Sequence, residues 1–444
     1  MVRAKRQSTQ TANRSKPITA LVANADGEIF DLAGYAAVGS DGTRNEWLTV
    51  SNTVPLPHGS ELMYLPDRAP VLYDLRASRW VVLSENPYAP GQAIYPVAAF
   101  NSPGYMITHT SAYEENAGAG YLPLFSYGAA GWHRSGFRSA VIRVDAEPRQ
   151  DLRRMPLEKV KAGVARMRRQ LPHNRLRAHL EKCALTYGCP AGKNFFLGRY
   201  EAPLPTATAC NARCLGCISL QAGGSMPCSQ ERIAFTPTAD EIAAVALAHI
   251  RKVQRAVVSF GQGCEGDPLT AADTIVEAIA QIRSATGEGT INMNTNGSLP
   301  DKIEDLLEAG LDSLRISMNS VRPACYHAYF RPKGYSFEDV TVGIDRALTR
   351  GTHVAINYLN CPGFTDTPEE CDALAAFIER HPIHMIQWRN LNFDPRRYVQ
   401  IMNDIAEHGP PMGAAALLEN IRRRFPRLRH GYFNPPKESW RNES

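Results

Sequence analysis

Apolar and polar positions follow different patterns in the first third of the chain and in its second half. Between residues 18 and 145, short apolar runs such as ALVANA, RWVVLS and SAVIRVD are separated by clusters of Gly, Pro, Asn and Asp. Such runs between turn-forming residues are typical of an all-β module. We therefore predict a β-rich accessory domain over 18–148. Residues 1–17 are basic and polar without an apolar segment, which predicts a disordered tail and not a secretory signal.

A helical period follows the β-rich region. Leu157, Val160, Val164 and Met167 recur on one face, and Pro172 interrupts the pattern, so we expect one or two helices between Pro156 and Leu185. Between positions 149 and 182 we count eleven Lys or Arg residues against three acids. We call residues 149–200 a basic helical linker. Its charge is that of a solvated helix face or, alternatively, of a contact for RNA phosphate or an acidic peptide.

Strand-like and helical stretches alternate from about residue 203 to 391. This alternation predicts a parallel sheet with helical crossovers, and thus an α/β fold. A C-terminal helical extension and tail over 393–444 follow it. The predicted strands are 206–209, 256–260, 290–294, 313–318, 353–359 and 383–388.

Composition narrows the class of protein. With 444 residues and 44% apolar content, the chain can bury two or three ordinary cores, and its apolar runs are too short to span a membrane. Ten cysteines at irregular spacing do not resemble the disulfide framework of a small secreted domain. We therefore expect a cytoplasmic protein with metal or redox chemistry.

Three cysteines form the most informative motif. Cys210, Cys214 and Cys217 are spaced C-x3-C-x2-C in the segment TATACNARCLGCISLQ. Thiolates at this spacing can hold three irons of a [4Fe-4S] cluster. The fourth iron then stays open to a ligand from outside the protein, as in catalytic metal sites. A zinc knuckle or three unrelated buried thiols are the alternatives.

This motif resembles the signature of the radical SAM (S-adenosylmethionine) superfamily. The resemblance implies a partial (β/α)6 TIM barrel over 201–392 with the cysteine loop after its first strand. The residue before the third cysteine is Gly216, where most members carry an aromatic residue. The resemblance also implies that the cluster reductively cleaves S-adenosylmethionine to a 5'-deoxyadenosyl radical. An electron donor such as flavodoxin or ferredoxin and oxygen sensitivity follow from that chemistry.

The loops after the later strands supply candidates for binding the cosubstrate. SFGQGCEGDPLT resembles the GGE-type motif that binds the amino group of S-adenosylmethionine, and either Glu265 or Asp267 is its acidic residue. Several polar residues at strand ends match positions that touch the ribose, the carboxylate or the adenine in the family, although turn and cap roles are the alternative for asparagine and serine. The full candidate set is Gly263, Glu265, Gly266, Asp267, Asn296, Ser317, Asn319 and Asn357.

The remaining cysteines suggest further chemistry. Cys325, after the fourth strand, is a candidate catalytic residue that donates a hydrogen atom or forms a covalent intermediate. Inert buried thiols are the alternative for each of the others. The candidates for a second cluster or metal are Cys183, Cys189, Cys228, Cys264 and Cys361.

The sequence leaves the substrate open. Frequent aromatic residues in the β-rich domain favour a protein or peptide that docks there. The two basic stretches, in the linker and at the C-terminus, favour RNA as the alternative. A non-catalytic metal-binding scaffold is the alternative from another class.

Overall fold

The computed structural model describes residues 16–134, 136–221 and 226–440. Most of the predicted tail 1–17 therefore lies outside the described residues. Contacts divide the chain into two compact units. The first comprises 1–144, 360–372 and 390–424, and the second comprises 145–359, 373–389 and 425–444.

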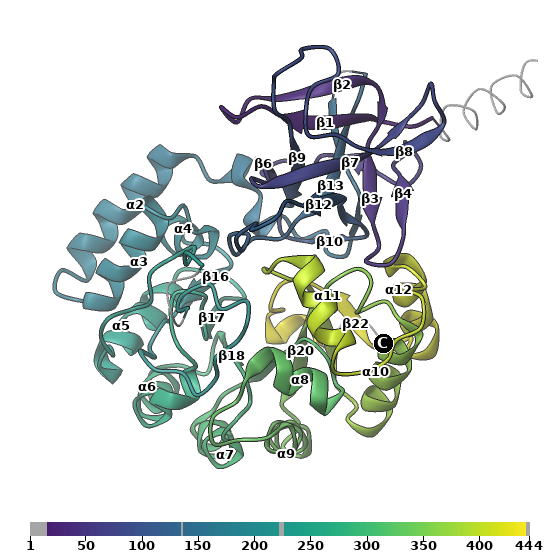
Figure 1. Cartoon of the computed structure of the whole chain (residues 1–444). Helices are drawn as coiled ribbons and strands as arrows, with labels where there is room; N and C mark the ends of the chain where they lie inside the picture. Colours follow the sequence, from purple (N-terminus) through teal and green to yellow (C-terminus); the bar gives the residue numbers. More distant parts are fainter. Residues whose placement is uncertain (1–15, 135, 222–225, 441–444) are drawn as a thin grey trace, which may run out of the picture. The chain divides into compact units, whose positions relative to one another are not determined.

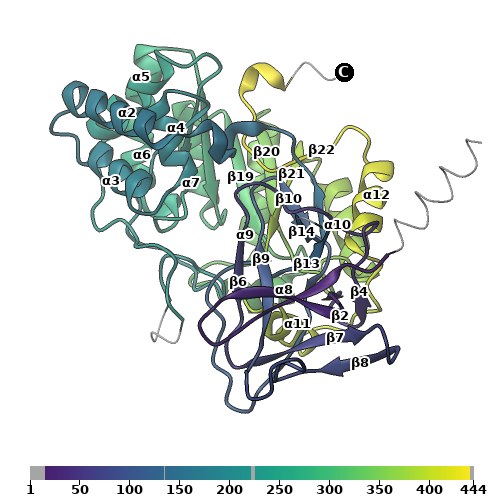
Figure 2. The same ribbon diagram turned by 90° about the horizontal axis from the view of Figure 1, so that it is seen from above.

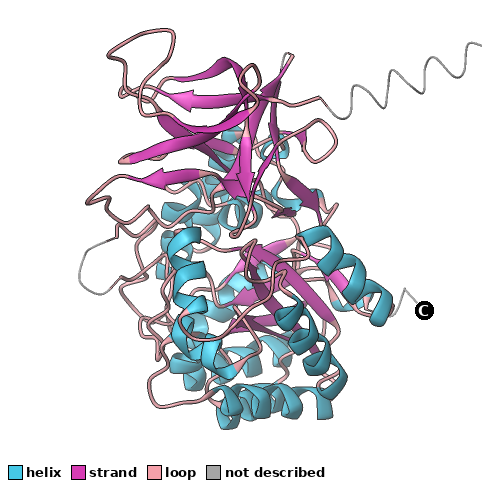
Figure 3. Ribbon diagram, turned by 45° about the vertical axis from the view of Figure 1, so that its right-hand side comes forward, coloured by secondary structure: helices cyan, strands magenta, loops and turns pink. Residues whose placement is uncertain are grey.

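Antiparallel strands build most of the first unit (Figure 3). Alternating apolar residues of β1, β2 and β7 form one of its core clusters, which contains Ala20, Val22, Leu32 and Leu72. The prediction of a β-rich N-terminal region is confirmed. The strands are β1 (Thr19–Ala23), β2 (Ile29–Ala36), β3 (Val38–Ser40), β4 (Asn45–Trp47), β5 (Val54–Pro55), β6 (Glu61–Tyr64), β7 (Arg68–Asp74), β8 (Arg79–Val82), β9 (Tyr95–Phe100), β10 (Tyr105–Ile107), β11 (Thr110–Ser111), β12 (Tyr113–Glu115), β13 (Gly128–His133), β14 (Gly136–Ser139) and β15 (Val141–Arg143).

Two helices from the C-terminal part of the chain complete this unit. They are α11 (Pro395–Asn403) and α12 (Ala414–Arg424). Buried Asp394, the N-cap of α11, accepts hydrogen bonds from Arg68 Nη2 at 3.1 Å and from the Tyr113 hydroxyl at 2.9 Å. A charged network therefore fixes α11 to β7 and β12.

The second unit begins with three packed helices, α2 (Leu157–Gln170), α3 (Arg175–Leu185) and α4 (Pro190–Leu197) (Figure 2). The predicted break is confirmed, because α3 restarts at Asn174, whose side chain accepts from the Arg177 amide. Val160, Val164 and Met167 are buried as the helical period predicts. A Cβ at Gly163 would lie 2.1 Å from the Phe196 carbonyl oxygen, so only glycine allows α2 and α4 to approach so closely.

A curled parallel sheet of seven strands in the order β16 to β22 forms the rest of the unit (Figure 1). The partial barrel is confirmed, with two differences. Its first strand is Glu201–Pro203 and not 206–209, because Leu204 makes the last ladder bond, to Ser259, before the chain turns into the cysteine loop. The C-terminal segment also adds a seventh strand. The strands are β16 (Glu201–Pro203), β17 (Val257–Phe260), β18 (Thr290–Thr295), β19 (Ser313–Met318), β20 (His353–Asn360), β21 (Met385–Asn390) and β22 (Arg429–Gly431).

Helices follow the strands as crossovers, with α5 opened by a capping box between Thr238 and Glu241. They are α5 (Ala239–Ile250), α6 (Ala272–Ala285), α7 (Pro300–Ala309), α8 (Pro323–Phe330), α9 (Phe337–Thr349) and α10 (Pro368–Arg380). No helix in the described parts of the chain is long and apolar enough to cross a lipid bilayer.

Candidate active site

The cysteine loop lies directly against the glycine-rich loop after β17. The amide of Gly266 donates to the Ala207 carbonyl at 2.7 Å, and the amide of Asp267 donates to the Ala209 carbonyl at 2.9 Å. A Cβ at Gly266 would lie 1.7 Å from the Ala209 carbonyl oxygen. The glycine is therefore required for the two loops to pair, immediately before Cys210.

The other side of the cysteine loop is held by the end of α8. The amides of Arg213 and Leu215 donate to the carbonyls of Phe330 and Tyr329 at 2.9 and 3.0 Å. The backbone between the cysteines is thus fixed from two sides, as a preorganised cluster site requires.

Burial and mutual repulsion keep protons on the sulfurs when no cation is near. Burial, followed by the negative charge of Asp267, raises the pKa of Cys210 to about 11. Burial and the neighbouring thiolates Cys217 and Cys210 raise the pKa of Cys214 well above its usual range. Three thiolates in this place therefore need strong positive charge among them, which iron supplies.

The spread of the sulfurs fits a cluster better than a single ion. Within the described residues, Cys210, Cys214 and Cys217 do not form a set whose ligand atoms all lie within 4.8 Å of one another. A tetrahedral zinc ion needs sulfurs about 4 Å apart, given a Zn–S distance of about 2.3 Å. A cubane accepts a wider spread because each thiolate binds a different iron.

The two candidate acids of the glycine-rich loop hold backbone in place. Glu265 accepts from the amides of Thr206 and Ala207 at 2.7 and 2.9 Å, and burial raises its pKa to about 7. Asp267 accepts from the Thr295 hydroxyl at 2.7 Å and from the Asn296 amide at 2.7 Å. Each carboxylate thus ties this loop to a neighbouring strand end. A contact of Glu265 or Asp267 with S-adenosylmethionine stays a prediction.

The candidates at the strand ends are distributed over three strands. The side-chain Nδ2 of Asn296 donates to Asn211 Oδ1 at 2.8 Å, which connects the end of β18 to the cysteine loop. Ser317 and Asn357 lie opposite each other in the β19–β20 ladder. Asn319 is buried and donates to the Cys325 carbonyl at 3.1 Å. Their contacts with a cosubstrate stay predictions, as does a catalytic role for Cys325, which is fully buried on α8.

Two arginines share the polar face of the sheet. The ladder places Arg315 on the same face as Asn294, and Arg315 Nη1 donates to Gln387 Oε1 at 2.6 Å. Arg389 donates to Asn357 Oδ1 at 3.1 Å, and its guanidinium lies 3.6 Å from the centre of the Tyr432 ring. Arg389 Nη2 also donates to Gln387 Oε1, at 3.4 Å. The two guanidiniums therefore share one acceptor.

These arginines have no acidic partner. No ion pair of Arg315 or Arg389 occurs in the described parts of the chain, and Arg315 Nε is buried without a hydrogen-bond partner there. Burial, followed by repulsion from Arg389, lowers the pKa of Arg315 to about 9. The neighbouring polar groups Gln387 and Asn434 are neutral, and the nearby carboxylate of Glu201, which acts against the lowered pKa of Arg315, lies 3.7 Å from Arg149. Sequence reasoning did not identify this pair.

The further cysteines are not equivalent. Cys183 on α3 and Cys264 on the glycine-rich loop come together, and with them His179, which sequence reasoning missed. The His-x3-Cys spacing on a helix was the available signal, because residues four apart share a face. Cys228 is exposed. Cys361 is buried in the first unit, and burial together with the negative charge of Asp366 raises its pKa.

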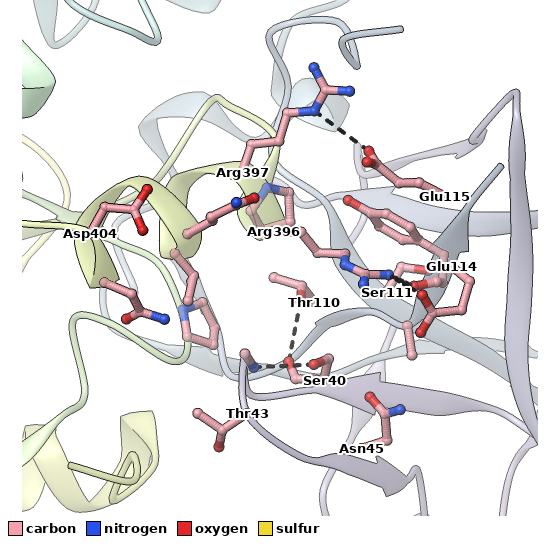
Figure 4. A pocket seen from close by; sticks show the side chains of 18 residues that line it. Ser40, Thr43, Asn45, Thr110, Ser111, Glu114, Glu115, Arg396, Arg397 and Asp404 are labelled. Atoms are coloured by element: carbon pink, nitrogen blue, oxygen red, sulfur yellow. Dashed lines mark hydrogen bonds and ion pairs between the residues drawn. The ribbon is translucent and has the colours of Figure 1, made fainter. Parts of the chain in front are cut away.

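A polar hollow of about 570 Å³ lies in the first unit, between α11 and strands β3, β11 and β12 (Figure 4). Its two arginines are already paired. Arg396 lies 3.0 Å from Glu114, and Arg397 lies 3.6 Å from Glu115. Unlike the barrel sheet, this hollow has no arginine without an acidic partner.

The three-cysteine loop follows the first strand of a parallel half barrel. Three thiolates at this place are suited to hold an iron–sulfur cluster. Residues 204–378 match the model of the radical SAM superfamily. The superfamily that this segment matches consists of enzymes whose cofactors are a [4Fe-4S] cluster and S-adenosylmethionine.

The chain is similar to several known proteins over part of its length. It is 31% identical over 178 residues to the GTP 3',8-cyclase of Heliobacterium modesticaldum. This alignment covers 40% of this chain and 50% of that protein. It is 29% identical over 196 residues to molybdenum cofactor biosynthesis protein 1 of Bos taurus, which covers 43% of this chain and 28% of that protein. The chain thus spans half or less of these relatives. The solved structure of HydG, a maturase of the [FeFe]-hydrogenase, aligns at 14% identity and a TM-score of 0.37 over 62% of this chain and 66% of that one.

Proposed function

We propose that the protein directs a 5'-deoxyadenosyl radical at a small anionic substrate that Arg315 and Arg389 hold on the polar face of the barrel sheet. The observation that carries this proposal is the positive charge without an acidic partner. Two half-buried guanidiniums near each other are costly unless an anion compensates them. A substrate phosphate or carboxylate would do so through bidentate hydrogen bonds.

The first substrate to test is a purine nucleoside triphosphate. Some of the relatives are named GTP 3',8-cyclase. The negative charge of a triphosphate would compensate the positive charge of the two arginines. This proposal replaces our expectation of a protein or peptide as the leading candidate.

The residues of the chain have separate tasks in this proposal. When bound, the cluster and S-adenosylmethionine would together supply the chemistry of the superfamily, a one-electron reductive cleavage that allows a hydrogen atom to be taken from the substrate. Cys210, Cys214 and Cys217 hold the cluster, and the glycine-rich loop positions the cosubstrate against it. Arg315 and Arg389 orient the substrate, and Gln387 holds both guanidiniums in register.

The test uses the full chain, reconstituted without oxygen and reduced with dithionite. With S-adenosylmethionine and GTP labelled with deuterium on the ribose, we expect 5'-deoxyadenosine that contains deuterium, measured by mass spectrometry. The Cys214→Ala variant is the control and should form none. Unlabelled 5'-deoxyadenosine that does not depend on any anionic substrate would overturn the proposed substrate class, while no product above the control would leave a non-catalytic scaffold.

A macromolecular substrate is the second candidate. Several aromatic side chains of the β-rich unit remain exposed, including Tyr88 at 65% and Trp80 at 46%, and exposed aromatic residues are enriched in docking surfaces. A peptide that docks there would give a KM that depends on these residues. RNA would instead bind with an affinity that falls steeply with salt, and a flat salt response would exclude it. A cytoplasmic location and a flavodoxin or ferredoxin as electron donor are part of the same proposal.

A further inference from the structure

Three potential metal ligands converge from two elements outside the cysteine loop. His179 and Cys183 lie one turn apart on α3, and Cys264 lies on the glycine-rich loop after β17. The ligand atoms of all three lie within 4.8 Å of one another. His179 Nε2 and Cys183 Sγ are 3.5 Å apart. No other set of three such side chains this close occurs in the described parts of the chain.

The geometry is that of a single ion. Ligands of a tetrahedral zinc ion lie about 3.5–4 Å apart, since Zn–S and Zn–N distances are about 2.3 and 2.0 Å. The side chains of residues four apart on a helix point the same way, so His179 and Cys183 present two ligands to one point. This set is tighter than that of Cys210, Cys214 and Cys217, which does not fall within the same limit.

The surroundings favour a thiophilic metal. Cys183 and Cys264 are 3% and 7% exposed, and both are free thiols. A third cysteine, Cys189, lies nearby in the backbone, where its amide donates to the Cys183 carbonyl at 3.0 Å. Thiolate and imidazole together select zinc or a similar borderline-soft ion over magnesium or calcium.

We propose that His179, Cys183 and Cys264 bind one zinc ion. The ion would join the helical segment of residues 157–197 to the barrel. This site does not depend on the proposed substrate.

Zinc here would also stiffen the active site. Cys264 immediately precedes Glu265, whose carboxylate accepts from the amides of Thr206 and Ala207 in the segment that leads into the cysteine loop. The Cys264 carbonyl itself accepts from the Ile233 amide at 2.7 Å, beyond the cysteine loop. An ion on Cys264 would therefore fix the backbone on both sides of the cluster loop.

The test separates this ion from the cluster. We would remove the cluster ligands with Cys210→Ala, Cys214→Ala and Cys217→Ala in one chain and measure metal by mass spectrometry after incubation with Zn²⁺ and gel filtration. About one zinc ion per chain should remain. Adding Cys183→Ser and Cys264→Ser should remove it, whereas adding Cys371→Ser, a buried cysteine outside the site, should not.

Cobalt provides a second measurement in a chain that keeps its native cysteines at the site. Co²⁺ in the cluster-free chain should give thiolate-to-cobalt charge-transfer absorption, and His179→Ala should weaken binding while circular dichroism stays unchanged. The proposal is overturned if the cluster-free, folded chain binds no Zn²⁺ or Co²⁺, if the ion remains without Cys183 and Cys264, or if these two cysteines form a disulfide in protein purified without oxygen.

Discussion

The two units treat their inward-facing arginines in different ways. In the β-rich unit, Arg68 is 2% exposed and lies 2.8 Å from Glu115 and 3.1 Å from Asp394. In the barrel unit, Arg315 and Arg389 are half-buried, share the Gln387 side chain as an acceptor and form no ion pair within the described residues, although the Glu201 carboxylate lies nearby. A buried charge in an ion pair fixes the arrangement of the side chains around it. A positive charge that forms no ion pair is a candidate site for an anionic ligand. The number of charges therefore says less about function than their pairing does.

The largest effect should come from breaking the paired arginine. Arg68→Met removes the nearest cation of buried Asp394, leaves Arg397 at 3.8 Å, and should lower the free energy of unfolding by about 3–5 kcal/mol. Urea denaturation followed by circular dichroism measures it, with exposed Arg76→Met as the control. A loss below that of Arg76→Met would mean that the Arg68 network contributes no stability.

A buried histidine of the barrel unit gives a third solution, which is to stay neutral. His249 is 2% exposed, and burial lowers its pKa from 6.5 to about 4. The unfolded chain then binds more protons between these pH values, so stability is complete above pH 6.5 and falls by about 3 kcal/mol as the pH drops through 4.

The comparison of wild type with His249→Gln measures this pH dependence. The free energy of unfolding of each protein is measured by denaturation at a series of pH values. Between pH 6.5 and 4 it should fall less for the variant than for the wild type, because the contribution of His249 is missing. Exposed His173→Gln is the control and should keep the wild-type profile. Identical profiles for all three proteins would contradict the role of His249.

Removing one of the barrel arginines should change binding more than folding. Arg389→Gln takes away one charge-assisted contact and should raise the KM for an anionic substrate about 10- to 100-fold. The free energy of unfolding should stay equal or rise, because repulsion with Arg315 ends. Steady-state kinetics with exposed Arg380→Gln as control checks it, and an unchanged KM would remove the arginine pair from the substrate site.

The smallest effect should come from an exposed aromatic residue of the β-rich unit. Trp80→Ser changes a half-exposed side chain that touches Tyr73, so its stability cost should stay near 1 kcal/mol. With a small anionic substrate the KM should not change. A clear rise in KM for a peptide substrate would instead favour docking on this unit.

Local patterns determined much of the fold. The apolar period of Val160, Val164 and Met167 predicted α2, in which all three residues are buried. The strand at 313–318 was likewise found at the predicted residues. These elements are encoded by neighbours in sequence, because periodicity and helix breakers act over one or two turns. The three-cysteine spacing is local in the same sense.

Only the tertiary structure decided what joins across long separations. The seventh strand, the union of residues 390–424 with the N-terminal strands, the shared acceptor of Arg315 and Arg389, and the meeting of His179 with Cys264 all involve residues far apart in the chain. No periodic pattern reports such contacts, since they depend on how sheets and helices pack. The sequence by itself therefore determined the cluster chemistry, and the packing decided where charge stays unpaired and where ligands converge.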